Sequence, residues 1–139
     1  MSLDLTPHIL LASRFLERSM TADGTASRGN FHLIKRKWSP PYPETTGYLI
    51  PTFLRLSKNG DQFLHFETLA KKMAEWLLTL QMENGAFPAG YFREGQKQTP
   101  SIFNSAQIML GLLAAAKHFE ESRFEKATLK CSGSVSYTH

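Results

Sequence analysis

The sequence predicts an all-α fold built from αα-hairpins in two layers. Its expected helices alternate between one apolar face and apolar residues on nearly every side. Two stretches about 60 residues apart start in equivalent places, as the units of a repeat do. A layer of buried helices beside a layer of solvent-facing helices would produce this alternation. We therefore expect αα-hairpin repeats that form part of an (α/α) toroid or solenoid.

The first expected helix covers residues 7–20. Thr6-Pro7 is typical of an N-cap followed by the first helical position. Its predicted core face consists of Ile9, Ala12, Phe15, Leu16 and Met20. Residues 21–43 contain glycines and three prolines without periodicity, and they predict a long loop.

A second helix is expected from Glu44 in "ETTGYLIPTFLRLS", which is apolar on nearly every side. Such a helix is usually buried. A strand is the alternative, but the length of the segment favours a helix. Pro51 removes a backbone donor, so it should kink the helix or confine its regular part to later residues. Asn59-Gly60 should end the helix, and Asp61 can cap the next one.

The third expected helix, residues 62–82, has a single apolar stripe, whereas the fourth, which begins after Ser101, is apolar all round. Ser101 is the predicted cap of the fourth helix. A last one-sided helix is expected from about Glu121. The stripe of the third helix consists of Phe63, Phe66, Leu69, Ala70, Met73, Trp76, Leu77 and Leu80.

The repeat pairs "ETTGYLIPTFLRLS" at residue 44 with "NSAQIMLGLLAAAK" at residue 104, and "FE" at 66–67 with "FE" at 124–125. About three or more such units are usually needed to bury a core. The chain is therefore expected to be a single helical domain, 1–139, that is a fragment of a longer toroid, with residues 129–139 as a non-native or disordered tail. A short, complete helical bundle is the alternative.

Composition narrows the class of protein. The 139 residues are 42% apolar and 20% charged, with a net charge of +4 and one cysteine, Cys131. No run is long enough for a transmembrane helix, and no secretory signal is recognisable. A lone cysteine fits a reducing compartment, so we expect a cytoplasmic protein without a membrane partner. Lys35-Arg36-Lys37-Trp38 could contact phosphates or single-stranded nucleic acid, but a solvated loop is the favoured interpretation, and no nucleic-acid partner is expected.

A spaced motif runs from Lys72 through Trp76-Leu77, Gln81 and Gly85 to Phe87. It resembles the repeated Gln–aromatic motif of terpenoid cyclase and prenyltransferase toroids, although Phe87 stands where Trp is usual. A Gln amide can bond unpaired backbone groups at helix ends, Gly permits the turn, and the ring packs the loop. The motif therefore predicts a tie between hairpins and not a catalytic group.

The wider pattern, over residues 25–128, resembles the N-terminal half of bacterial six-hairpin (α/α) toroid proteins found among polysaccharide-related genes. It is carried by "PPYPETTGYLIPTFLRLS", "AEWLLTLQMENGAFPAGYF" and "SIFNSAQIMLGLLAAA". The resemblance implies an (α/α) barrel. The Asp-rich motif of terpenoid cyclases and the zinc ligands of prenyltransferases are absent, so isoprenoid chemistry is the less favoured interpretation.

In such toroids the N-termini of the inner helices line the mouth of the cavity. Aromatic rings stack on sugar rings, and amides and carboxylates bond hydroxyl groups. Glu44 is the candidate general acid or base, although at a helix start it also suits the helix dipole without any chemistry. Glycoside hydrolysis needs a second carboxylate, which the sequence does not nominate. The candidate ligand-binding residues are Arg28, Trp38, Tyr42, Tyr48, Asn104 and Gln107.

Two classes of function remain from the sequence. One is a carbohydrate-related toroid, either enzyme or binder, and the other is a non-catalytic helical scaffold for protein interaction. His65 and His118 have no ligand-like spacing, so no metal is expected, and no cofactor motif is present. Exposed apolar hairpin faces should drive homo-oligomer formation, above all at the helix near residues 103–118.

Overall fold

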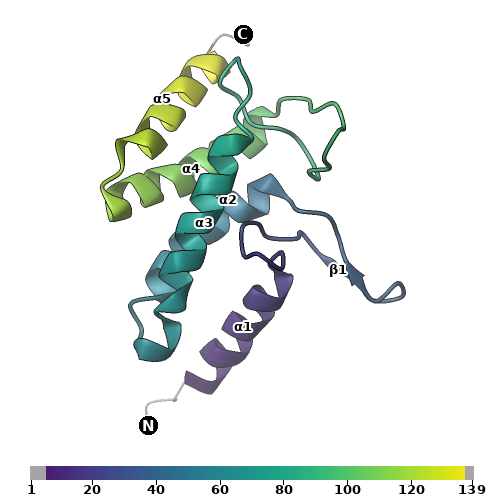
Figure 1. Ribbon diagram of the computed structural model, residues 1–139, viewed down its shortest axis with the longest axis vertical. Coiled ribbons are helices and arrows are strands. Elements are labelled where there is room, and N and C mark those ends of the chain that lie inside the picture. Colours follow the sequence, from purple (N-terminus) through teal and green to yellow (C-terminus); the bar gives the residue numbers. More distant parts are fainter. Residues whose placement is uncertain (1–5, 137–139) are drawn as a thin grey trace.

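The computed structural model describes residues 6–136 and confirms the all-α class. The α-helices are α1 (Thr6–Ser19), α2 (Pro43–Leu56), α3 (His65–Thr79), α4 (Ile102–Phe119) and α5 (Ser122–Ser136). A 3-10 turn, η1 (Asp61–Phe63), precedes α3, and strands β1 (Phe31–His32) and β2 (Lys37–Trp38) form a small antiparallel hairpin. Figure 1 shows this hairpin projecting from the helices. The (α/α) toroid or solenoid stays a prediction.

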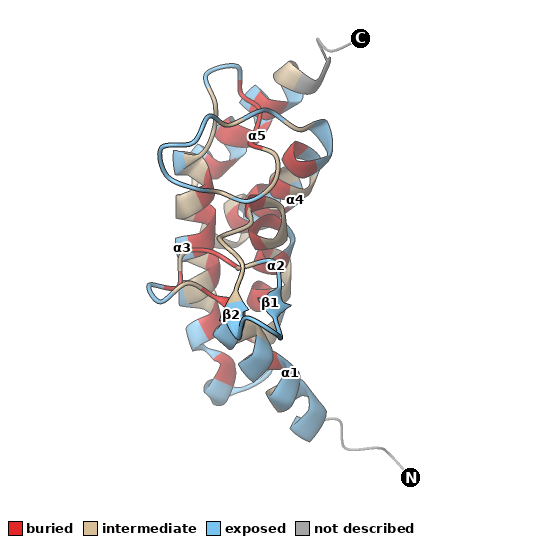
Figure 2. Cartoon of the chain, turned by 90° about the vertical axis from the view of Figure 1, so that its right-hand side faces the viewer, coloured by how far each residue is buried: buried red, intermediate tan, exposed pale blue. Residues whose placement is uncertain are grey.

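Two successive helical hairpins, α2–α3 and α4–α5, build the core. Helix α2 packs against both α3 and α4, and α4 packs against both α2 and α5. Figure 2 shows buried residues concentrated along the helices where they face one another. Phe66 near the start of α3 and Phe124 near the start of α5 are both fully buried, so the repeated "FE" places equivalent rings in the core. The largest fully buried side chains include Phe53, Phe66, Phe87, Phe124, Ile50, Met73, Leu77, Ile108 and Leu112.

Helices α2 and α4 approach so closely that glycine is needed on both. A Cβ atom added at Gly111 would lie 2.2 Å from the Gly47 carbonyl oxygen, and one added at Gly47 would lie 2.7 Å from the Ile108 Cα. Real Cβ atoms do not approach backbone this closely, so the two backbones touch where any side chain would separate them. This crossing sets the geometry between the two hairpins.

The helix boundaries follow local chemistry, with two corrections. Ser101 caps α4, as predicted, by accepting a hydrogen bond from the Asn104 backbone N–H. Helix α2 begins at Pro43 and continues through Pro51, so the expectation that Pro51 confines the regular part of the helix to later residues is wrong. Pro43, at the first helical position, costs no hydrogen bond, because a backbone N–H at that position has no partner inside the helix. Asp61 does not cap α3, because it lies within η1 and makes no side-chain cap bond.

The burial of α1 and α4 differs from the sequence-based expectation. Leu16 and Met20 of the predicted core face contact the core, as does Leu10, but the face is wrong for Ile9, Ala12 and Phe15, which are exposed. Helix α4 is not buried on every side: Phe103 is 63% exposed and Leu110 is 58% exposed. Apolar residues on every side of a helix allow several faces to be buried, but within the described residues α4 packs mainly against α2, α5 and α3, and the face with Phe103 and Leu110 stays exposed.

Two further segments, the expected loop and the expected C-terminal tail, contain more regular structure than the sequence predicts. The expected long loop, residues 21–43, contains the β1–β2 hairpin and is otherwise irregular. Residues 129–136, expected as a tail, continue α5, and Cys131 among them is fully buried. Residues 137–139 of that expected tail lie outside the described part. Within residues 6–136, no helix has the length and apolar character needed to cross a bilayer.

The Gln–aromatic motif acts as the predicted tie. The Gln81 Nε2 donates to the Gly85 carbonyl at 3.0 Å and to the Ala127 carbonyl of α5 at 2.7 Å. Phe87 is fully buried, and its backbone N–H donates to the Ser105 hydroxyl of α4 at 2.8 Å. Gly85 has φ +89°, and an added Cβ would meet the Lys130 carbonyl at 2.5 Å. The loop after α3 is thereby fastened to the following hairpin.

Candidate ligand-binding site

Two of the residues nominated from the sequence, Arg28 and Trp38, line a groove of about 750 Å³ beside the loop before α2. We call it the basic groove. Its residues come from the segment between α1 and α2 and from the loop between α3 and α4. They are Thr21, Arg28, Asn30, His32, Lys35, Lys37, Trp38, Ser39, Pro40, Pro41, Tyr91 and Arg93.

The charge of the basic groove is entirely positive. Arg28, Lys35, Lys37 and Arg93 line it, and no Asp or Glu does. None of these four cations forms an ion pair with another residue of the described chain. A concave surface with one sign of charge concentrates ligands of the opposite sign. The groove is therefore suited to an anionic ligand.

Hydrogen bonds between distant segments shape the groove. The Thr46 hydroxyl on α2 accepts from the Ser27 backbone N–H and donates to the Tyr42 carbonyl, which holds the loop against the helix. The Asn30 side-chain amide donates to the Tyr91 hydroxyl at 3.3 Å. The Phe92 backbone N–H donates to the Pro41 carbonyl at 2.8 Å. These bonds bring the loop after α3 across to residues 28–41.

A polar cluster lies beside the groove, where the N-termini of α2 and α4 meet. The rings of Tyr42 and Tyr91 lie 5.1 Å apart. In the amide orientation that satisfies both its ends, Asn104 donates to the Glu44 carboxylate at 3.2 Å and accepts from the Gly90 N–H at 3.3 Å. Burial raises the pKa of Tyr42 above its ordinary value, and the adjacent Glu44 carboxylate raises this pKa further.

The structure brings together some of the seven residues nominated from the sequence and separates others. Tyr42, Glu44 and Asn104 form the polar cluster, while Arg28 and Trp38 line the adjoining basic groove. Tyr48 lies elsewhere, in the second hollow described below, and Gln107 lines none of the hollows described here. Their functional roles stay predictions.

The second hollow, which we call the aromatic hollow, lies between α1, the β1–β2 hairpin and α2. Its volume is about 480 Å³, and it shares Arg28, Asn30 and Trp38 with the basic groove. The Trp38 ring lies 5.7 Å from that of Phe15 and 5.2 Å from that of Phe31. The apolar residues that line it are Phe15, Leu16, Phe31, Leu33, Trp38, Tyr48 and Leu49.

Asn30, Tyr91 and Arg93 were not nominated from the sequence. Tyr91 and Arg93 belong to a loop of about twenty residues between α3 and α4, and no local pattern shows which segment that loop will contact. The hydrogen bonds from this loop to Asn30 and Pro41 show that it contacts the segment before α2. The available signal was compositional: "GYFREG" places an aromatic pair beside an arginine.

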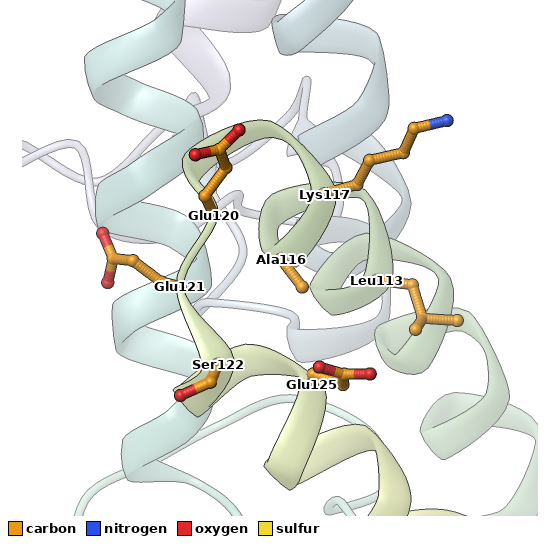
Figure 3. Close-up of a pocket in the computed structure, with 7 residues that line it drawn as sticks. All are labelled: Leu113, Ala116, Lys117, Glu120, Glu121, Ser122 and Glu125. Carbon is orange, nitrogen blue, oxygen red and sulfur yellow. The ribbon is translucent and has the colours of Figure 1, made fainter.

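A third hollow, at the turn between α4 and α5, is lined by carboxylates and is a weaker candidate. Figure 3 shows Glu120, Glu121 and Glu125 around it, with Lys117 at its edge. Glu121 already pairs with Lys71 of α3 and with Arg123, and these partners lower the pKa of Glu121. Its carboxylate therefore serves to hold α3 to the turn.

No three His, Cys, Asp or Glu side chains among residues 6–136 are placed to hold a metal ion. His65 instead contacts Glu17, and His118 contacts Glu67 at 2.6 Å. Each histidine thus joins two helices through one carboxylate.

The chain was compared with models of protein families, with curated proteins and with solved structures. None of the three comparisons finds a match.

Proposed function

We propose that this chain binds an acidic oligosaccharide in the basic groove. The observation that carries the proposal is the set of four unpaired cations, Arg28, Lys35, Lys37 and Arg93, on a concave surface without a lining carboxylate. Uronic acids and sulfated sugars carry anionic groups at regular intervals, and guanidinium groups bind carboxylates and sulfates through paired hydrogen bonds.

Two further features support a sugar as the ligand. Trp38 and Tyr91 supply aromatic rings on which a sugar ring could stack, while Asn30 and Ser39 supply groups that bond hydroxyls. The N-termini of α2 and α4 meet beside the groove, and the positive ends of helix dipoles favour anions. Glu44 is one carboxylate in this region, whereas glycoside hydrolysis uses a pair, so the proposal is limited to binding.

Trp38 offers an intrinsic probe for the test, because it lines the groove. The full chain would be titrated with an oligouronate and with a neutral oligosaccharide of equal length, followed by tryptophan fluorescence and calorimetry. We expect the oligouronate to bind, with an affinity that falls as salt is raised. The double variant Arg28→Ala and Arg93→Ala should weaken binding roughly tenfold or more.

A matched control removes the same charge elsewhere. Lys126→Ala with Lys130→Ala changes two exposed cations on α5, and binding should be unchanged. Equal loss of affinity in both double variants would show that net charge alone is responsible. Failure to bind the oligouronate, or tighter binding of a single-stranded oligonucleotide, would overturn the carbohydrate proposal.

A helical interaction scaffold is the second candidate function, and exposed apolar side chains on α4 favour it. Ile102, Phe103, Leu110 and Leu113 are each between 46% and 63% exposed. Phe103, Leu110 and Leu113 recur at helical spacing, so they share one face. Light scattering tests whether this face pairs copies of the chain: Phe103→Ser with Leu110→Ser should convert an oligomer to a monomer, and a monomeric parent chain would contradict the homo-oligomer.

A further inference from the structure

The turn between β1 and β2 exposes two adjacent large aliphatic side chains. Leu33 is 80% exposed and Ile34 is 90% exposed, the highest fractions among the exposed large apolar residues. Figure 1 shows the hairpin standing away from the helical body. Neither side chain belongs to the core, so the fold gains little from them. Apolar residues on a projecting turn are typical of a surface that meets another apolar phase.

Positive charge surrounds this turn. Lys35 and Arg36 complete the turn after Leu33 and Ile34, Lys37 begins β2, and all three are exposed. Between Asp23 and Glu44 the sequence has no carboxylate. Arg36 has a positive φ of 46°, which places it in the tight reversal that returns the chain to β2. The exposed aliphatic pair therefore lies within a segment that carries basic side chains and no acidic ones.

The apolar surface continues from the turn onto α1. Leu33, Phe31 and Phe15 line the same hollow. Leu11 lies one helical turn before Phe15 on the same face of α1, and these two are 65% and 59% exposed. Arg14 and Arg18 are exposed on the same helix. Helix and hairpin together present apolar groups flanked by cations.

We propose that this surface docks the chain onto an anionic lipid membrane. Leu33 and Ile34 enter the boundary between headgroups and acyl chains, and Lys35, Arg36 and Lys37 contact the headgroup phosphates and carboxylates. Interfacial segments combine apolar insertion with basic residues in this way, and long basic side chains keep their charged ends at the headgroup level. Charge complementarity selects an anionic bilayer over an uncharged apolar partner.

This inference goes beyond the proposed binding of a sugar and revises the expectation of no membrane partner. Docking at a surface requires no membrane-spanning helix, so it is compatible with the helices described above. Lys35 and Lys37 line the basic groove as well, but Leu33 and Ile34 do not. Substitutions at the aliphatic pair therefore separate membrane docking from occupation of the groove.

The test is sedimentation of the purified full chain with vesicles of phosphatidylcholine alone and with added phosphatidylserine. We expect binding only to the vesicles that contain phosphatidylserine, weakened by salt. Leu33→Ser with Ile34→Ser should lower the partition coefficient by roughly tenfold or more, because two apolar insertions are lost. The control, Leu129→Ser, changes an exposed leucine on α5, outside both the turn and the exposed face of α4, and should leave partitioning unchanged.

Several outcomes overturn the proposal. They are no binding to either vesicle, equal binding to both, or equal loss in the turn and control variants. The turn variant should retain oligouronate binding, so failure of membrane docking and failure of the groove proposal are distinguishable. Circular dichroism of each variant checks that the helices persist.

Discussion

The side-chain amide of Gln81 joins the end of α3 to the Ala127 carbonyl in α5, across a hydrogen bond of 2.7 Å. The same Nε2 also donates to the Gly85 carbonyl. One side chain thus stabilises the turn after α3 and fixes the position of the next hairpin. Gly85 can have no side chain here, because a Cβ would strike the Lys130 carbonyl.

Gln81→Ala should therefore lower the free energy of unfolding by about 1–3 kcal/mol, because two partly buried carbonyl groups each lose a hydrogen bond. Chemical denaturation followed by circular dichroism measures this change. Gln96→Ala, at an exposed loop position, is the control and should leave stability unchanged. Equal stability of the two variants would remove Gln81 from its role as a tie.

Phe87→Ala should lower the free energy of unfolding by about 3–5 kcal/mol, because the ring is fully buried and its removal leaves a cavity. Phe103→Ala deletes the same ring from an exposed site on α4 and should have a much smaller effect. Thermal melting of both variants makes the comparison. A melting temperature unchanged by Phe87→Ala would contradict the packing role.

Gly111→Ala should destabilise the chain by about 3 kcal/mol or more, because the added methyl group must displace the Gly47 backbone. Alanine otherwise favours helices over glycine by about 1 kcal/mol, so the sign of the change is diagnostic. Ala106→Leu, which adds atoms at an exposed position of α4, should leave stability nearly unchanged. A stabilising Gly111→Ala would show that α2 and α4 are farther apart than described.

Glu44→Gln should lower the pKa of Tyr42, because the carboxylate is a secondary contributor, after burial, to its upward shift. A raised pKa in the folded state contributes stability that is complete below the unfolded tyrosine pKa of about 10 and is lost as pH rises through the folded value. Titration of ¹³C-labelled tyrosine by NMR follows Tyr42 directly. Glu125→Gln, near the distant turn between α4 and α5, is the control and should leave the pKa of Tyr42 unchanged.

The helices were predictable because their apolar periodicity and caps are local properties. The stripe of α3, the cap at Ser101 and the Gln81–Gly85 hydrogen bond each depend on residues close together in the chain. The meeting of Tyr42, Glu44 and Asn104 followed from the repeat, since equivalent helix starts lie at the same end of packed hairpins. Which face of α1 is buried could not be predicted from the sequence, because apolar residues occur on two faces of this helix.

The amino-acid sequence by itself determined the helical class, most helix boundaries and the residues at the hairpin tie. Tertiary structure decided which apolar faces are covered, as exposed Leu110 and buried Leu112 on one helix show. It alone also placed Arg93 and Tyr91 beside Arg28 to complete the basic groove. Helix formation depends on neighbours within a few residues, whereas a groove between loops depends on contacts between segments more than sixty residues apart, which no local pattern encodes.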